Sequence, residues 1–288
     1  MMRNMNLMGI PVVGIGSQPT EDEELNYLSM PKDMATYRPA ILPESEDLQD
    51  YPRVLNLLQQ LQYLLNNRVA GAAGTERFLT LEGVQTVEKQ LLAQILAEGE
   101  VGILFDTGDG GHIEIQESGL PGVWWHRMLD ENKECQYETL EVGLIPQLVR
   151  EGTFDFARMD VPLPDAASLP ETIINAPWLL AELQEQVQKQ NFGHVINLSL
   201  LPLSEDDLGL ITQQLGIGKT AILSRGYGNC RITATHVENV WWVQYYNSTD
   251  TLILNTLEVV EVPLVACASP EDLEDSAERL REIREALQ

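Results

Sequence analysis

The sequence predicts an α+β protein made of two tandem, related modules, each combining helices with a mainly antiparallel sheet. The first observation is a repeat: Val-Trp-Trp, then Thr-Leu-Glu-Val, then Pro recur in the same order, with Trp124 and Trp241 117 residues apart. The second is that apolar residues alternate along the segments next to both Trp-Trp pairs, as in half-buried strands. The third is that leucines at helical spacing precede the strands in both halves. A segment that occurs twice indicates a duplicated module.

The repeat also sets the expected domain boundaries. Residues 1–48 hold Gly, Pro, Met and acids without periodicity, so we expect an extended N-terminal arm. The first module then covers residues 49–150. Three prolines mark residues 151–174 as a linker. The second module covers residues 175–288 and is closed by a C-terminal helix.

Within the first module, periodicity predicts a helix over residues 52–66, a short strand over 78–81 and a second helix. Gly99 is expected to end that second helix in the left-handed conformation. Upstream of the Trp strands the repeat continues at a spacing of 119 residues, which pairs Leu79 with Leu198. The two residues by which the spacings differ are expected in a turn, because one extra residue in a strand would reverse every later side chain.

The second module is expected to follow the same plan. A helix around Trp178 to Val187 is followed by a strand with the sequence VINLSL. Ser204 and the acids that follow it form a capping box for the next helix. Ser269-Pro270 has the pattern of the first turn of a last helix, which carries an apolar stripe along one side.

The Trp-Trp pairs supply the first candidate binding residues. Neighbours on a strand point to opposite faces, so one ring of each pair should differ from the other. The first ring of each pair is expected to be buried. Trp125 and Trp242 share their faces with Arg127 and Gln244, which makes them candidates for contact with a partner. The alternative is a second core layer beneath a helix.

A second candidate lies in the arm. Gly14, Gly16, Ser17, Gln18 and Pro19 belong to the segment GIGSQP, which could form a tight turn that offers backbone amides to a partner. A single G-x-G before a proline is weak evidence for a nucleotide site.

Composition excludes several classes of partner. A net charge of −26 argues against nucleic acid, which is bound by clustered Lys and Arg, and favours a basic protein or peptide. No apolar run approaches the roughly 18 residues of a spanning helix, so no membrane insertion is expected. The first residues make a poor signal peptide, and we expect a cytoplasmic protein.

Residue spacing predicts no catalytic centre, no metal site and no cofactor. Cys135, Cys230 and Cys267 are far apart and include no C-x-x-C pair. The histidines show no paired-ligand spacing, and the acids are expected to be a solvated face. The segment ending in Gly-Lys219-Thr lacks the first glycine of a phosphate loop and runs from helix to strand. Glu141 and Glu258 are expected to pair with an Arg or to cap a turn.

In combination, several segments of the chain resemble the HupH/HyaF/HoxQ family of NiFe-hydrogenase expression proteins. The resemblance spans nearly the whole chain and is carried by GIGSQP, the arm from LNYLSMP to LPE, INLSLLPLSEDD, LGIGKTAILSRGYG, NVWWVQYYN with TLEVVEVP, and SPEDLEDSAERL. The arm departs from the family pattern at Ile15, where Pro is expected between the glycines.

The resemblance implies a cytoplasmic accessory protein, not an enzyme. Its implied partner is the immature iron–sulfur small subunit of an uptake hydrogenase before twin-arginine export, with a thioredoxin-like hydrogenase accessory protein as a companion. An iron–sulfur or metal carrier that uses the three cysteines is the alternative, and a nucleotide-driven maturation enzyme that uses Lys219 is a third possibility.

Overall fold

The structure is a computed structural model. It describes residues 50–71, 76–165, 167, 169–226 and 228–287. The predicted N-terminal arm, with its GIGSQP segment, lies outside these residues.

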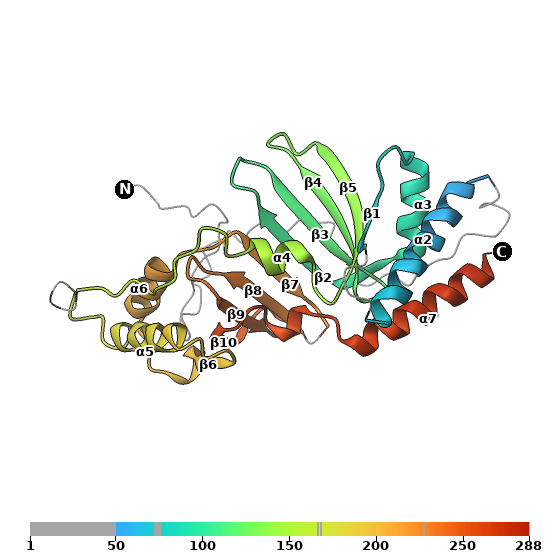
Figure 1. The fold of residues 1–288 in the computed structure, drawn as a ribbon. Helices are drawn as coiled ribbons and strands as arrows, with labels where there is room; N and C mark the ends of the chain where they lie inside the picture. Colours follow the sequence, from blue (N-terminus) through green and yellow to red (C-terminus); the bar gives the residue numbers. More distant parts are fainter. Residues whose placement is uncertain (1–49, 72–75, 166, 168, 227, 288) are drawn as a thin grey trace. The chain divides into compact units, whose positions relative to one another are not determined.

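The chain forms two compact units, each an α+β structure of helices and antiparallel strands as the sequence predicts (Figure 1). The first unit contains residues 50–152, 222–226 and 264–287, and the second contains residues 153–221 and 228–263.

The first unit contains most of the first module and the C-terminal helix. Its elements are α2 (Pro52–Val69), β1 (Phe78–Thr80), α3 (Thr86–Leu96), β2 (Glu98–Asp106), β3 (His112–Ser118), β4 (Val123–Leu129), β5 (Cys135–Val142), α4 (Gln147–Gly152), η3 (Leu264–Ala266) and α7 (Pro270–Ala286). Its strands are ordered β1-β5-β4-β3-β2, and each neighbouring pair is antiparallel.

The second unit repeats this plan. Its elements are α5 (Ala176–Gln188), β6 (His194–Asn197), η2 (Leu198–Leu200), α6 (Glu205–Leu215), β7 (Thr220–Ser224), β8 (Asn229–Ala234), β9 (Val240–Tyr246) and β10 (Leu252–Val259), with β7 divided between the two units. The order β6-β10-β9-β8-β7 is the same as in the first unit, strand for strand. Two tandem related modules are therefore confirmed.

The strand register corrects one detail of the predicted repeat. Leu79 lies opposite Leu140 in the first unit, and the corresponding residue of the second unit is Ile196, which lies opposite Leu257. Leu198, predicted to match Leu79, begins the 3-10 turn η2 instead. The strand over VINLSL was thus predicted too long. The spacing is 117 residues at this strand and becomes 119 only in the loop before α6, where extra length leaves the register intact.

Gly99 is needed for a different reason from the predicted helix cap. The residue that ends α3 in the left-handed region is Ala97, with φ of +54°. Gly99 lies in β2, where a Cβ atom would come within 2.3 Å of the carbonyl oxygen of Ser118. Its counterpart Gly218 would clash similarly, at 2.6 Å from the carbonyl oxygen of Thr235. The repeated glycine therefore permits close backbone approach.

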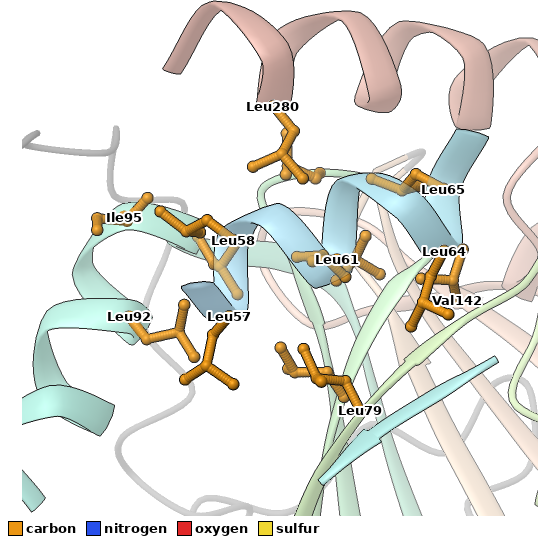
Figure 2. Close-up of a cluster of buried hydrophobic side chains, with 14 of the residues drawn as sticks. Leu57, Leu58, Leu61, Leu64, Leu65, Leu79, Leu92, Ile95, Val142 and Leu280 are labelled. Atoms are coloured by element: carbon orange, nitrogen blue, oxygen red, sulfur yellow. The ribbon is translucent and has the colours of Figure 1, made fainter. Parts of the chain in front are cut away.

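One hydrophobic cluster in each unit lies between the helices and one face of the sheet. In the first unit, leucines of α2 contact side chains of α3, α7 and the sheet (Figure 2). In the second unit, the cluster is formed by the inner faces of α5 and α6 and by Ile196, Val240, Leu257 and Val259. Burial of each such side chain contributes about 1.5–3 kcal/mol, so these clusters fix the helices on the sheets.

Among the described residues, every helix is too short or too polar to span a lipid bilayer.

Candidate partner-binding site

The first tryptophan of each pair is a core residue, as predicted. Trp124 and Trp241 are fully buried. The indole Nε1 of Trp124 donates to the carbonyl oxygen of Gly143 at 2.8 Å, and that of Trp241 donates to the carbonyl oxygen of Glu261 at 3.2 Å. These bonds satisfy the one polar atom of each ring, so both rings can be buried without an unpaired donor.

The second tryptophan of each pair lies on the opposite face, which the helices cover. Trp125 and Trp242 are half-buried and pack against the hydrophobic clusters of their own units. The Nε1 of Trp242 donates to Oδ1 of Asn255. The buried Nε1 of Trp125 has no hydrogen-bond partner among the described residues. Each ring therefore has one part in the core and another part open to solvent.

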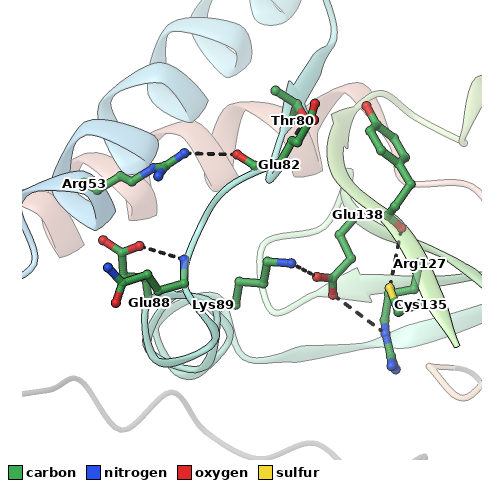
Figure 3. A network of polar contacts seen from close by, with 10 residues as sticks. Arg53, Thr80, Glu82, Glu88, Lys89, Arg127, Cys135 and Glu138 are labelled. Atoms are coloured by element: carbon green, nitrogen blue, oxygen red, sulfur yellow. Dashed lines mark hydrogen bonds and ion pairs between the residues drawn. The ribbon is translucent and has the colours of Figure 1, made fainter.

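Beyond Trp125, the same sheet face carries a charged rim made of Arg127, Glu138 and Lys89, and Figure 3 shows the contacts among these three side chains. Arg127 is exposed, and its Nε lies 3.8 Å from Oε1 of Glu138, the residue opposite it on β5. Lys89 of α3 forms an ion pair with the same carboxylate. The side chain of Arg127 is 50% exposed, whereas those of Lys89 and Glu138 are 28% and 13% exposed, so this charged rim is only partly open to solvent.

The other face of the first sheet carries buried polar side chains. Glu141 is fully buried, and its Oε1 accepts a hydrogen bond from the backbone N–H of Gln147 at 2.9 Å. The carboxylate therefore caps the start of α4, one of the two roles expected for it. The other carboxylate oxygen, Oε2 of Glu141, lies 3.0 Å from Nε2 of His126, whose side chain is also buried.

Glu117 adds a second buried carboxyl to this face. Burial raises its pKa to about 7, and the negative charges of Glu100 and Asp272 act in the same direction. Hydrogen bonds with the backbone of Gly122 and Val101 lower the pKa but offset only part of the increase. Glu117 thus changes charge near neutral pH in a place that solvent barely reaches.

The cysteines show no arrangement suited to holding a metal. Burial raises the pKa of Cys230 to about 12 and that of Cys267 to about 11, so both thiols stay protonated at neutral pH. Cys135 is exposed. Within the described ranges, no three His, Cys, Asp or Glu side chains gather so that they could hold a metal ion.

Lys219 has the surroundings of a surface side chain. Its Nζ lies 5.1 Å from the ring centre of the exposed Phe156. The loop that contains it runs from α6 into β7, the reverse of the strand-to-helix direction that phosphate binding uses.

Two features of the site escaped the sequence-based reasoning. The burial of Glu117 depends on its place opposite Trp124 in the sheet register, which no local pattern reveals. Trp178 lies on α5 but is 77% exposed. The exposure of Trp178 could have been predicted from the sequence, because Leu179, Leu180 and Leu183 define the buried stripe of the helix and Trp178 falls outside it.

These observations define a class: a tandem α+β repeat protein whose candidate contacts are half-buried aromatic rings beside polar rims. The conserved region described as "HupH hydrogenase expression protein, C-terminal conserved region" matches twice, over residues 53–165 and 173–287. The chain belongs to the HupH hydrogenase expression protein family.

Two relatives match over nearly the full length of this chain, and one solved structure matches over part of it. The chain is 45% identical to "Hydrogenase expression/formation protein HupQ" of Azotobacter chroococcum mcd 1, covering 96% of this chain and 97% of the relative. It is 30% identical to "Hydrogenase-1 operon protein HyaF" of Escherichia coli (strain K12), covering 94% of each. A solved structure, "Hydrogenase expression protein HupH from Thiobacillus denitrificans ATCC 25259", is 26% identical, with a TM-score of 0.35 over 38% of this chain and 92% of that chain.

Proposed function

We propose that the protein is an accessory protein of hydrogenase maturation that acts in the cytoplasm as a chaperone. It binds the immature iron–sulfur small subunit of a NiFe uptake hydrogenase before twin-arginine export. A thioredoxin-like hydrogenase accessory protein is its proposed companion in this step. The observation that supports the proposal most directly is the family match in both modules, together with relatives whose names include hydrogenase expression or formation.

The geometry is consistent with a binding role. Trp125 and Trp242 each combine a packed ring with partial exposure, and the charged pair Arg127 and Glu138 lies further along the same sheet face as Trp125. Aromatic side chains ringed by polar groups commonly supply most of the binding energy of an interface. The protein's net charge of −26 suits a partner with basic segments.

The direct test is to tag the full chain, capture it from cells that express an uptake hydrogenase, and identify the proteins that accompany it. We expect the precursor of the small subunit, with its export signal intact, to be recovered. Recovery of only the mature, exported form, or of no hydrogenase subunit, would contradict the proposal.

Tryptophan variants test the binding residues. We expect Trp125→Ala and Trp242→Ala each to weaken capture of the small subunit by about 2 kcal/mol or more, which is roughly 30-fold. Trp241→Ala should instead destabilise the fold by about 3–5 kcal/mol, because it leaves a large cavity. Melting temperature and capture are measured in parallel, with Tyr63→Ala as an exposed aromatic control. If Trp242→Ala melts as early as Trp241→Ala, the second ring is a core residue and the contact surface lies elsewhere.

A further inference from the structure

The indole N–H of Trp125 is a buried donor without an acceptor among the described residues. A buried N–H group that gives up its hydrogen bond to water and gains none in return destabilises the folded state. The other three rings of the two Trp-Trp pairs each donate to an oxygen atom. For Trp242, the repeat counterpart of Trp125, that atom is Oδ1 of Asn255. The two modules therefore differ at this one hydrogen bond.

The residue that takes the place of Asn255 in the first module is Glu138. The two residues are 117 positions apart, which is the spacing of the Trp-Trp pairs. Each lies one diagonal step across the sheet from the second tryptophan of its own module. Diagonal neighbours on adjacent antiparallel strands are within reach of aromatic and long side chains. A rotation of the Glu138 side chain can thus bring its carboxylate to the indole N–H of Trp125, as the amide of Asn255 reaches Trp242.

Two cations hold the carboxylate of Glu138 in a different position (Figure 3). Lys89 of α3 forms an ion pair with its Oε2. Nε of Arg127 lies 3.8 Å from its Oε1. The acceptor that corresponds to Asn255 is therefore engaged by Lys89 and Arg127, and Trp125 is left without it.

The second module has neither of these cations. Gln244 takes the place of Arg127, at the spacing of 117 residues. The helices α3 and α6 begin with equivalent capping boxes, whose N-cap residues are 119 positions apart. By this spacing the counterpart of Lys89 is Leu208, a buried core residue. The carboxylate and both cations thus occur together in the first module and are replaced together in the second.

We propose that Lys89 and Arg127 form a binding site for a carboxylate group of a partner protein, and that Glu138 occupies this site in the free protein. When the partner's carboxylate binds to the two cations, Glu138 turns and accepts a hydrogen bond from the indole N–H of Trp125. The incoming group replaces the ion pairs that Glu138 gives up, while a buried donor gains an acceptor. Binding and the turn of Glu138 therefore favour each other. This adds a chemical requirement to the proposed contact at Trp125 and rests on that proposed function.

Acetate serves as the carboxylate probe, and the test uses the full chain. Titration with sodium acetate is compared with sodium chloride at matched ionic strength, so that the two salts screen exposed charges equally. The indole N–H signals are followed by proton–nitrogen correlation NMR, and the signal of Trp125 is assigned by its loss in Trp125→Phe. We expect acetate to move this signal downfield, as a new hydrogen bond does, and chloride to leave it unchanged.

Variants should produce the same arrangement without a probe. Glu138→Asn introduces the residue of the second module, so the Trp125 signal should lie downfield before acetate is added. Lys89→Gln combined with Arg127→Gln releases Glu138 and should have the same effect, after which acetate should cause no further change. Lys189→Gln, which breaks another Lys–Glu ion pair, is the control and should leave the signal unchanged.

Glu138→Ala distinguishes the proposal from a direct effect of acetate on the ring. This variant keeps both cations but removes the acceptor, so acetate should no longer move the Trp125 signal. A response to acetate in Glu138→Ala, no response in the wild type, or an unchanged signal in Glu138→Asn would each overturn the proposal. The measurement involves no hydrogenase subunit, so its failure is distinguishable from a failure of the proposed function.

Discussion

Glu141 and Glu258 occupy the same register position, opposite Trp124 and Trp241, yet their surroundings differ. Glu141 caps α4, whereas Oε1 of Glu258 accepts a hydrogen bond from Thr256 at 3.1 Å. Burial raises the pKa of Glu258, with the hydrogen bond from Thr256 acting against it. The tryptophan of each pair is therefore buried in both copies, while the glutamate is fully buried only in the first copy and serves a different local role in each.

Glu117 should make the stability of the first unit depend on pH. Its pKa is about 7 in the folded protein against an ordinary 4.5, so between these values the folded state binds more protons than the unfolded chain. The resulting stabilisation is fully present below about pH 4.5 and is lost as the pH rises through 7. We expect the free energy of unfolding of Glu117→Gln to increase relative to that of the wild type by up to about 3 kcal/mol as the pH rises from 5 to 8.

Urea unfolding at both pH values measures this difference. Glu131→Gln, which removes a carboxylate from an exposed turn, is the control for the loss of one charge. An identical effect of Glu117→Gln at pH 5 and pH 8 would contradict the expectation.

At the scale of elements, one carboxylate organises the helix starts of the second unit. Oδ1 of Asp207 accepts hydrogen bonds from the backbone N–H groups of Ile174, Asn175 and Ala176, each at 2.9 Å. The same residue completes the capping box with Ser204. Burial alone would raise the pKa of Asp207, but these backbone hydrogen bonds together bring it below its usual value. A single side chain thus fixes the start of α5 beside the start of α6.

We expect Asp207→Ala to destabilise the protein by about 3 kcal/mol at pH 7, because it leaves several backbone donors without an acceptor. Asp272→Ala is the matched control, since Asp272 forms the equivalent capping box on α7 without bonds to a second helix. Its cost should be about 1 kcal/mol. Urea unfolding compares the two, and equal costs would show that the bonds to the start of α5 add nothing.

Because the folded pKa of Asp207 is lowered, the stability that this residue contributes is present above pH 3.8 and is lost as the pH falls below that value.

Most element types follow from local sequence. The capping boxes at Ser204 and Ser269, the leucine stripe of α2 and the burial of Trp124 were all predictable, because each depends on a few neighbouring residues. The length of β6 was not, because the side chain of Asn197 accepts a hydrogen bond from the backbone of Ser199 and turns the chain after the strand. The bond of Asp207 to α5 was also invisible, since it joins residues more than 30 positions apart.

At the scale of the whole molecule, periodicity gives α7 an apolar stripe but does not reveal what the stripe packs against. In the structure α7 joins the first unit, on α2, although the second module separates the two helices in the chain. The same limit applies to the candidate site. Alternation along β4 predicts which ring faces which side, but the packing of Trp125 against the helices is a long-range result.

If the two units are stabilised separately, core substitutions should act locally. Leu280→Ala removes a fully buried side chain of α7 and should cost about 2–5 kcal/mol. We expect amide hydrogen exchange to speed up in α2 and to stay unchanged in α5. Leu210→Ala in α6 is the reciprocal variant. For this variant we expect amide exchange to speed up in α5 and to stay unchanged in α2. Equal acceleration in both units for both variants would show a single cooperative structure.

The packing of α7 on α2 also sets the order in which the chain can fold during synthesis. When α2 leaves the ribosome, the helix that covers its outer side has not been translated, and it follows only after the whole second module. Domains usually fold from the N-terminus as they emerge, but the first unit is complete only after α7, which follows the second module in the chain, has been made. A chain whose translation stops before α7 leaves Leu58, Leu61 and Leu65 without their cover. Such a truncated chain therefore exposes apolar surface that the finished chain buries.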